Sequence, residues 1–248
     1  MDLSEVRGTV VRHPWETARA AAIERVLMAA HVEPETILDY GCGDGFTGER
    51  MLTSLRAARL TGFDIHLTNE QCEARSREQI TYTNDWEHAR TGRFDLCLLC
   101  DVIEHVEDDR ALLERVQDSL SAQGQVLLTV PAFQTLFTSH DRALRHFRRY
   151  TLAELEGVAR SSGLQVAASG YLFASLLPAR GIAKLSEAMK PKVSTDEFGI
   201  GAWTGSKALT RALETALNWD NSVLLALAAR GIKLPGLSAW ALCKKQSL

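Results

Sequence analysis

The sequence has few of the features that would place it in a membrane, on nucleic acid or in a disulfide-linked scaffold. No apolar run approaches the roughly 18 residues that a membrane span needs. Lys and Arg number 28 against 31 Asp and Glu, a formal net charge of −3 at pH 7, whereas domains that bind nucleic acid broadly are usually basic. The five cysteines are an odd number, so we expect no disulfide framework.

The sequence also shows no targeting leader at its start and no cysteine pattern that we assign to a metal site. The opening M-D-L-S-E-V-R lacks a positively charged leader followed by an apolar core, so we expect a cytoplasmic protein. Cys97 and Cys100 form C-x-x-C, but F-D-L-C-L-L-C-D-V reads as a strand, in which residues three apart point to opposite faces. We therefore predict two buried core thiols and assign no metal ligand.

What the chain does have is material for one sizeable core. Its 248 residues are 46% hydrophobic and 24% charged, which fits a single α/β domain with an insertion better than two domains. An amphipathic helix after His13-Pro14-Trp15 predicts an N-terminal helical cap over residues 1–34. We expect a helical insertion over residues 173–236, before a final strand L-S-A-W-A-L-C-K-K.

Glycines cluster in T-I-L-D-Y-G-C-G-D-G-F-T-G, directly behind an apolar run that reads as a buried strand. Gly41, Gly43 and Gly45 remove the Cβ at alternate positions, which lets the chain turn sharply and lets a ligand lie against bare backbone. Residues 46–57 then read as a helix. A strand, a glycine turn and a helix N-terminus together predict a nucleotide-type site.

A dinucleotide site is the obvious rival. Its G-x-G-x-x-G pattern would need glycine at position 46, where this chain has Phe46. Asp39 stands where a dinucleotide-binding strand carries a small or apolar side chain, and a buried carboxylate suits a cationic ligand better. Both observations disfavour an NAD-dependent oxidoreductase.

Strands and helices alternate along the rest of the chain. We expect further strands at 59–65, 80–84, 94–102, 124–131 and 164–172, and helices at 68–78, 107–121 and 151–162. Thr151 and Glu154 have capping-box spacing. This alternation predicts a doubly wound, mostly parallel sheet.

The chain resembles the class I, Rossmann-like S-adenosylmethionine-dependent methyltransferases over about residues 35–170 and the final strand. The resemblance rests on I-L-D-Y-G-C-G-D-G, on Asp64 ending the second strand, on Asp85 after the third and on D-V-I-E-H-V after the fourth. It implies a seven-stranded sheet whose last strand is antiparallel, and S-adenosylmethionine as cofactor. The function it implies is methyl transfer to a small-molecule acceptor.

The resemblance also implies a set of cofactor-binding residues. Asp64 would accept both ribose hydroxyls and Asp85 the adenine amino group, with Trp86 beside the adenine. Asp64 as a mere helix cap and Glu87 as the adenine-binding acid remain alternatives. The remaining residues that the resemblance places around the cofactor are Asp39, Gly41, Cys42, Gly43, Ile65, Cys100 and Asp101.

Two groups of histidines lie where the acceptor is expected. His105 follows the fourth strand, and His140 belongs to S-H-D-R-A-L-R-H-F-R-R-Y, which resembles an H-D-x-x-x-x-H-x-R-R-Y signature in a bacterial branch of the family. Either histidine is a candidate general base, and a structural role for His105 is equally open. The loop that contains His140 has two interpretations: it faces the substrate and binds a carboxylate or phosphate, or it is a solvated connection. Its candidate substrate-binding residues are His146, Arg148, Arg149 and Tyr150.

The insertion has three interpretations: an acceptor lid, a homodimer surface or an interfacial membrane helix. Its leucine stripe at Leu209, Leu213, Leu217, Leu224 and Leu227 is more typical of packing than of ligand binding. Its place beside the sixth strand favours the lid, and the net acidity weakens the membrane interpretation. A non-catalytic module that binds S-adenosylmethionine and serves as a partner remains the alternative to an enzyme.

Overall fold

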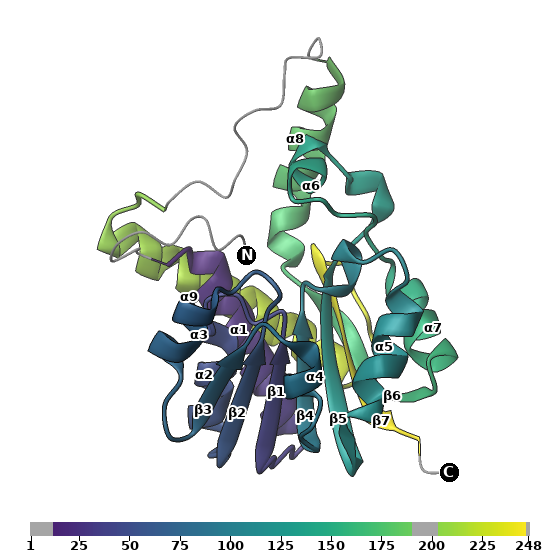
Figure 1. Ribbon diagram of the computed structural model, residues 1–248. Helices are drawn as coiled ribbons and strands as arrows, with labels where there is room; N and C mark the ends of the chain where they lie inside the picture. Colours follow the sequence, from purple (N-terminus) through teal and green to yellow (C-terminus); the bar gives the residue numbers. More distant parts are fainter. Residues whose placement is uncertain (1–11, 190–202, 247–248) are drawn as a thin grey trace.

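A seven-stranded sheet forms the centre of the protein in the computed structural model, which describes residues 12–189 and 203–246 (Figure 1). The strand order is β3-β2-β1-β4-β5-β7-β6. Neighbours from β3 to β5 are parallel, and β7 runs antiparallel to both β5 and β6. The predicted fold class is thereby confirmed. The strands are β1 (Thr36–Tyr40), β2 (Arg59–Phe63), β3 (Ile80–Thr83), β4 (Phe94–Cys100), β5 (Leu120–Pro131), β6 (Leu164–Leu172) and β7 (Ser238–Lys245).

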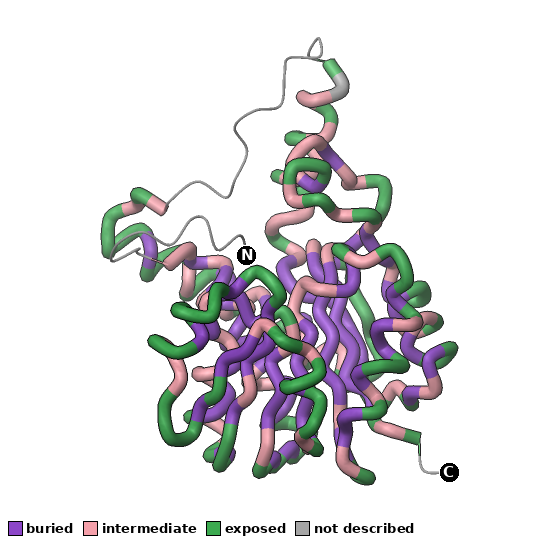
Figure 2. The backbone as a smooth tube through the Cα atoms, viewed as in Figure 1, coloured by how far each residue is buried: buried purple, intermediate pink, exposed green. Residues whose placement is uncertain are grey.

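Helices cover both faces of this sheet, and the strands between them are largely buried (Figure 2). One face packs against α1 (Pro14–Ala29), α2 (Phe46–Ser54), α3 (Asn69–Arg75) and α9 (Lys207–Ala228). The other packs against α4 (Trp86–Ala89), α5 (Asp109–Asp118) and α7 (Leu152–Ser161). Two short helices, α6 (Ser139–Ala143) and α8 (Leu177–Met189), lie above the carboxyl edge of the sheet in Figure 1.

Local sequence signals account for several of these boundaries. The Thr151 side chain accepts from the backbone of Glu154 while the Glu154 carboxylate accepts from Thr151, so α7 starts with the predicted capping box. Gly163 follows the helix with φ of +82°, a left-handed conformation in which glycine has no Cβ strain. Strand β6 has the predicted bounds.

The boundary between α5 and β5 differs from the prediction. The helix ends at Asp118 rather than at 121, and β5 begins at Leu120 rather than at 124. Leu120 pairs with Phe94 at the start of β4, followed by a register shift. Pairing with a distant strand therefore sets this boundary, and the local sequence does not show it.

The two cysteines of C-x-x-C lie on opposite faces of the sheet, as predicted. Cys97 is fully buried in the core beneath α5 and α7. Cys100 packs at the edge of the other core. All five cysteines are free thiols.

The two helices of the insertion have different surroundings. Helix α9 packs against α1 and β6, and its buried Asn221 accepts a hydrogen bond from the backbone of Phe173 at 2.9 Å. Of the leucine stripe, Leu217 and Leu224 are buried, whereas Leu209 and Leu213 are exposed. Helix α8 instead contacts the loop that follows β5. In the part of the chain that the structure describes, no helix combines the length and apolarity of a membrane span.

Candidate active site

The glycine turn brings backbone of β1, β2 and β4 together at the carboxyl edge of the sheet. The N–H groups of Gly41 and Cys42 both donate to the carbonyl of Phe63, at 2.7 and 3.0 Å. Gly41 has φ of +72°, and a Cβ there would lie 2.7 Å from Cγ2 of Val102. A larger residue at position 41 would therefore be strained and would also clash.

Asp39 lies beneath this turn rather than at its surface. It is buried and accepts a hydrogen bond from the Gly48 N–H at 3.0 Å. A Cβ on Gly48 would come within 2.6 Å of that carboxylate oxygen, so the fourth glycine of the motif allows helix α2 to approach Asp39. Burial raises the pKa of Asp39 to about 7, although the Gly48 hydrogen bond and nearby Arg19 act to lower it.

Asp64 joins the glycine turn to the end of β2. Its carboxylate accepts from the N–H of Gly43 and from the N–H of His66, each at 2.9 Å. Helix α3 is capped by Thr68, which forms a capping box with Gln71. Asp64 is therefore not the cap of the next helix, and the alternative that it only caps is wrong.

Trp86, after β3, packs with aromatic side chains at the ends of β1 and β2. The Trp86 ring makes edge contacts with Tyr40 and Phe63, with centroids 5.1 and 5.5 Å away. Asp85 is exposed and caps α4 by accepting from the Glu87 N–H at 2.9 Å. The Glu87 side chain is 73% exposed and pairs with Arg90, directly after α4. Ile65 is also exposed.

At the end of β4, Asp101 has φ of +57° and accepts a hydrogen bond from Thr129 at 3.2 Å. Its carboxylate also forms an ion pair with Arg19 of helix α1, and the Arg19 guanidinium lies over the ring of Trp15. Cys100, the residue before Asp101, is partly exposed at this edge. Sequence reasoning missed Arg19; its place one helical turn after Trp15 is the signal that could have found it.

Two more arginines close over the glycine turn. Arg12 pairs with Asp44 at 2.5 Å and lies over the ring of Phe46. Arg75 donates to the carbonyl of Gly43 at 3.1 Å. Bare backbone, carboxylates and the guanidinium groups of Arg12, Arg19 and Arg75 thus meet at this edge of the sheet.

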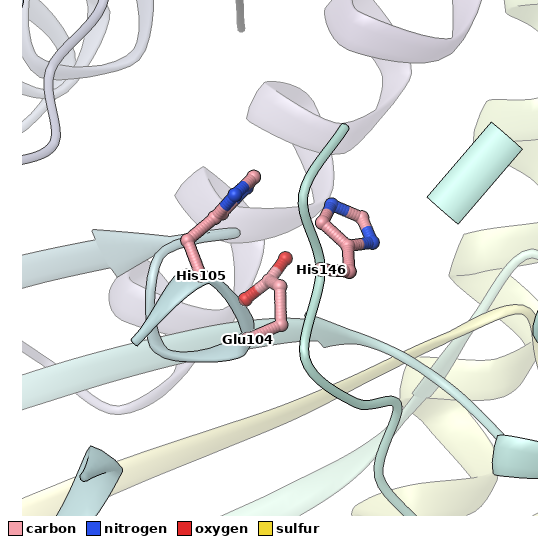
Figure 3. A group of neighbouring side chains, drawn as sticks. All are labelled: Glu104, His105 and His146. Atoms are coloured by element: carbon pink, nitrogen blue, oxygen red, sulfur yellow. The ribbon is translucent and has the colours of Figure 1, made fainter. Parts of the chain in front are cut away.

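Beside the glycine turn lie the 3₁₀-helix η2 (Ile103–His105) and the loop between β5 and α7, residues 132–151, which we call the acceptor-side loop because the acceptor is expected there. The backbone N–H of Phe147 donates to the carbonyl of Glu104 at 2.8 Å, which fastens this loop to η2. The rings of His105 and His146 meet edge to face, with centroids 4.5 Å apart, and Glu104 lies beside them (Figure 3). The structure thus brings together two predicted histidines and a glutamate that sequence reasoning did not single out.

Burial changes the protonation of this cluster. It raises the pKa of the fully buried Glu104 to about 8. Partial removal of its ring from solvent, followed by the proximity of His146, lowers the pKa of His105 to about 4, although the residue as a whole is exposed. The imidazole of His105 is therefore neutral at neutral pH and has a lone pair available.

Asp141 holds the acceptor-side loop in shape. Its side chain is completely buried and accepts from Arg149 at 2.7 Å, from Arg180 of α8 at 2.5 Å and from the backbone of Thr138 at 2.8 Å. The Nδ1 atom of His146 lies 3.2 Å from the same carboxylate. The aspartate of the loop signature is therefore a structural centre.

The remaining predicted substrate residues differ in exposure. Tyr150 is buried, and its hydroxyl donates to Asp109 at 2.7 Å. Arg149 is also buried, in its pair with Asp141. The side chain of Arg148 is 32% exposed and pairs with Asp109 at 3.0 Å. His140, on α6, is partly buried, and burial followed by the nearby Arg180 lowers its pKa.

A family model described as a methyltransferase domain matches residues 14–169. The chain belongs to this methyltransferase family. The match spans α1, the strands from β1 to β5 and part of β6, and so includes the glycine turn, Asp64 and the acceptor-side loop. A comparison with curated proteins finds no match.

Solved methyltransferases share the fold at low sequence identity. The N-methyltransferase NodS from Bradyrhizobium japonicum WM9, in complex with S-adenosylhomocysteine, is 13% identical over 95% of this chain and 89% of its own, with a TM-score of 0.53. A SAM-dependent methyltransferase from Archaeoglobus fulgidus is 15% identical, covering 93% and 97%, with a TM-score of 0.51. The plantazolicin methyltransferase BpumL, in complex with S-adenosylhomocysteine and a monoazolic substrate analogue, is 16% identical, covering 94% and 85%, with a TM-score of 0.52.

Family membership confirms the predicted class of S-adenosylmethionine-dependent methyltransferases, and S-adenosylmethionine is the cofactor. The residues present fit this ligand. The backbone of Gly41 is exposed at this edge, and the acidic side chains of Asp64 and Asp101 follow the ends of β2 and β4. A phosphate cradle is not needed, because the ligand carries a sulfonium, an ammonium, a carboxylate and an adenosine.

Proposed function

We propose that this methyltransferase acts on a small-molecule acceptor that carries an anionic group. The observation that carries this proposal is the fastening of a cationic loop, between β5 and α7, to η2 at the end of β4. Because the cofactor-side residues Asp64 and Asp101 end β2 and β4 at the same edge, a small molecule under this loop would lie beside the methyl group.

We propose that the predicted cofactor residues divide the ligand between them. Asp64 would take the ribose hydroxyls by charge-assisted hydrogen bonds, and Asp85 and Trp86 would flank the adenine, with Ile65 as apolar cover. Asp101 would face the ammonium and Arg19 the carboxylate of the methionine part. Asp39, Gly41, Cys42, Gly43 and Cys100 would shape the backbone around it.

Catalysis in this proposal is chiefly placement. The bound cofactor supplies an electrophilic methyl group, and the acceptor must lie about 3–3.5 Å from it, in line with the bond that breaks. The acceptor atom forms a bond to the methyl carbon while the sulfur–carbon bond breaks and leaves its electron pair on sulfur. His105 and His140 are the candidates to accept a proton from a hydroxyl acceptor, since a neutral imidazole has a free lone pair.

Of the arginines at the fixed positions of the loop signature, Arg148 is partly exposed and Arg149 is buried, while Arg142 and Arg145 elsewhere in the loop are exposed. Arg148 keeps about a third of its side chain exposed, and its partner Asp109 also accepts from Tyr150. Arginine binds carboxylate and phosphate groups in a bidentate manner. We propose that Arg148 and His146 face the acceptor, while the buried Arg149 and Tyr150 act by holding the loop.

Helix α8 supports the lid interpretation of the insertion. Its Glu187 accepts from the backbone of Ser139 and from Arg142, and its Lys184 donates to the carbonyl of Phe137. These contacts tie α8 to the acceptor-side loop, whereas α9 packs on the body of the fold. We propose that α8 covers the acceptor and that residues 1–248 act as one domain. Residues 1–11 of the N-terminal cap and residues 190–202 of the insertion lie outside the part of the chain that the structure describes. Dimerisation stays a competing role for the exposed part of α9.

An activity assay with paired acceptors tests this proposal. Transfer from methyl-labelled S-adenosylmethionine would be measured for small molecules with a carboxylate or phosphate and for their neutral esters, alongside calorimetry with S-adenosylhomocysteine and NAD. We expect preference for the anionic member of a pair. Binding of S-adenosylhomocysteine without any transfer would instead favour a non-catalytic partner module.

Arg148→Ala sharpens the test. We expect a higher KM for the anionic acceptor and an unchanged affinity for S-adenosylhomocysteine, which is the pattern of lost uniform binding. Arg110→Ala on α5 is the matched control, because Arg110 is an exposed arginine that pairs only with Glu114 on its own helix among the described residues. Equal KM values for the two variants would refute the role of Arg148.

A further inference from the structure

Glu104, His105 and His146 form a compact group of potential metal ligands. One ligand atom from each residue lies within 4.8 Å of the other two. Figure 3 shows the three side chains gathered beside one another, two from η2 and one from the loop that crosses it. The group therefore draws its ligands from two segments that the fold brings together.

The carboxylate of Glu104 is a second, independent sign of a ligand. Glu104 is 0% exposed, and neither of its oxygens has a hydrogen-bond partner within residues 12–189 and 203–246. A buried carboxylate without a partner is strongly unfavourable, and buried polar groups in native proteins are almost always satisfied. A cation between Glu104 and the two imidazoles would supply what the carboxylate lacks.

The surroundings of the imidazoles also suit a metal. The Nδ1 atom of His146 faces the Asp141 carboxylate at 3.2 Å, which leaves Nε2 for a cation. The His105 ring meets the His146 ring edge to face, with centroids 4.5 Å apart. Ligating histidines usually have their other nitrogen bonded to a carboxylate or a backbone carbonyl, which fixes the ring and its tautomer.

The kinds of donor atom indicate the kind of ion. Two imidazole nitrogens and one carboxylate suit Mn²⁺, Fe²⁺, Co²⁺ or Zn²⁺ better than Mg²⁺ or Ca²⁺, which prefer oxygen ligands. Three protein ligands leave coordination positions open, as in catalytic metal sites. His105 itself is exposed, so the group of ligands can be reached from solvent.

We propose that Glu104, His105 and His146 bind one divalent first-row transition-metal ion at the acceptor edge of the sheet. The further step, that this ion holds an oxygen of the acceptor, rests on the proposed function. In that case His105 would act as a metal ligand, and the ion would lower the pKa of the coordinated hydroxyl so that its proton passes to bulk water.

Metal binding by the full chain tests the site without any acceptor. Tag-free protein, first treated with a chelator, would be titrated with Co²⁺ and with Zn²⁺ by calorimetry, and the Co²⁺ complex would be followed by its visible absorption. We expect one ion per chain. Glu104→Gln and His105→Ala should each weaken binding by more than about 100-fold, since even loss of an outer partner of a metal ligand costs 10–100-fold.

Two controls separate this result from other causes. His88→Ala removes an exposed histidine on α4 and should leave the stoichiometry and affinity unchanged. The Glu104→Gln and His105→Ala variants should keep their affinity for S-adenosylhomocysteine, which shows that they are folded; the exposed His105 is the safer of the two to replace. Absence of saturable binding in the wild type, or wild-type affinity in both ligand variants, would overturn the proposal. These metal-binding measurements do not depend on methyl transfer, so the metal site and the proposed function can be refuted independently of each other.

Discussion

Replacement of Asp141 by asparagine should lower the free energy of unfolding more than the same replacement of an exposed aspartate. The Asp141 side chain is 0% exposed and accepts from Arg149, Arg180 and Thr138, with His146 also in contact. Asparagine keeps one carbonyl oxygen, turns the other position into a donor that faces donors, and removes the negative charge.

The expected loss of stability follows from the two arginines that the variant leaves without a carboxylate partner. Arg149 and Arg180 would be left with side chains only 6% and 16% exposed and without their carboxylate. Breaking a buried ion pair by removing one partner costs about 3–5 kcal/mol. Because whole domains are stable by only about 5–15 kcal/mol, Asp141→Asn should lose a large fraction of the free energy of unfolding.

Urea unfolding at pH 7 in the presence of a chelator measures the loss. Asp108→Asn is the matched control, since Asp108 is an exposed N-cap whose carboxylate accepts from the Ala111 N–H, and asparagine caps a helix as well as aspartate does. We expect a change within about 0.5 kcal/mol for that control. Hydrogen exchange over residues 138–150 would detect a loss confined to the loop. A decrease below about 1 kcal/mol together with unchanged exchange in this loop would show that Asp141 is not the structural centre we describe.

The other predictions concern the cofactor and pH. Asp64→Ala should weaken binding of S-adenosylhomocysteine by about 1.5–3 kcal/mol, the range for hydrogen bonds to charged groups, which calorimetry would show as a dissociation constant at least about tenfold higher; an unchanged constant would remove Asp64 from the site. Although burial acts to raise it, hydrogen bonds from Ser169 and Lys233 help to lower the pKa of Glu156 from 4.5 to about 2. The stabilisation from Glu156 is therefore complete above pH 4.5 and is lost as the pH falls toward 2, so the difference in urea midpoint between wild type and Glu156→Gln should shrink over that interval. A difference that stays constant with pH would contradict the assigned hydrogen bonds.

The sequence by itself determined the features that depend on neighbouring residues. The glycine turn, the capping box at Thr151 and the bounds of β6 were predicted because turn chemistry, capping and side-chain periodicity are local. The order of strands and acids was sufficient for the family and its cofactor. Even the opposite placement of Cys97 and Cys100 followed from the period of a strand.

Only the tertiary structure decided which charged side chains pair with one another around the acceptor-side loop. Four arginines in one loop look alike in the sequence, yet Arg149 is buried on Asp141 while Arg148 stays partly exposed. Sequence spacing alone does not select partners, because an ion pair between segments depends on where packing places the two charges. The same reason applies to Arg19, which reaches Asp101 from the first helix.

The meeting of His105 and His146 is the clearest case. Each histidine was singled out from its own segment, but their edge contact, and the unpartnered carboxylate of Glu104 beside them, arise only because the loop after β5 is fastened across η2. Local patterns therefore predicted which strand ends are followed by glycine, acidic or histidine residues. Long-range packing decided which of those side chains share one site, since burial and proximity are properties of the folded chain.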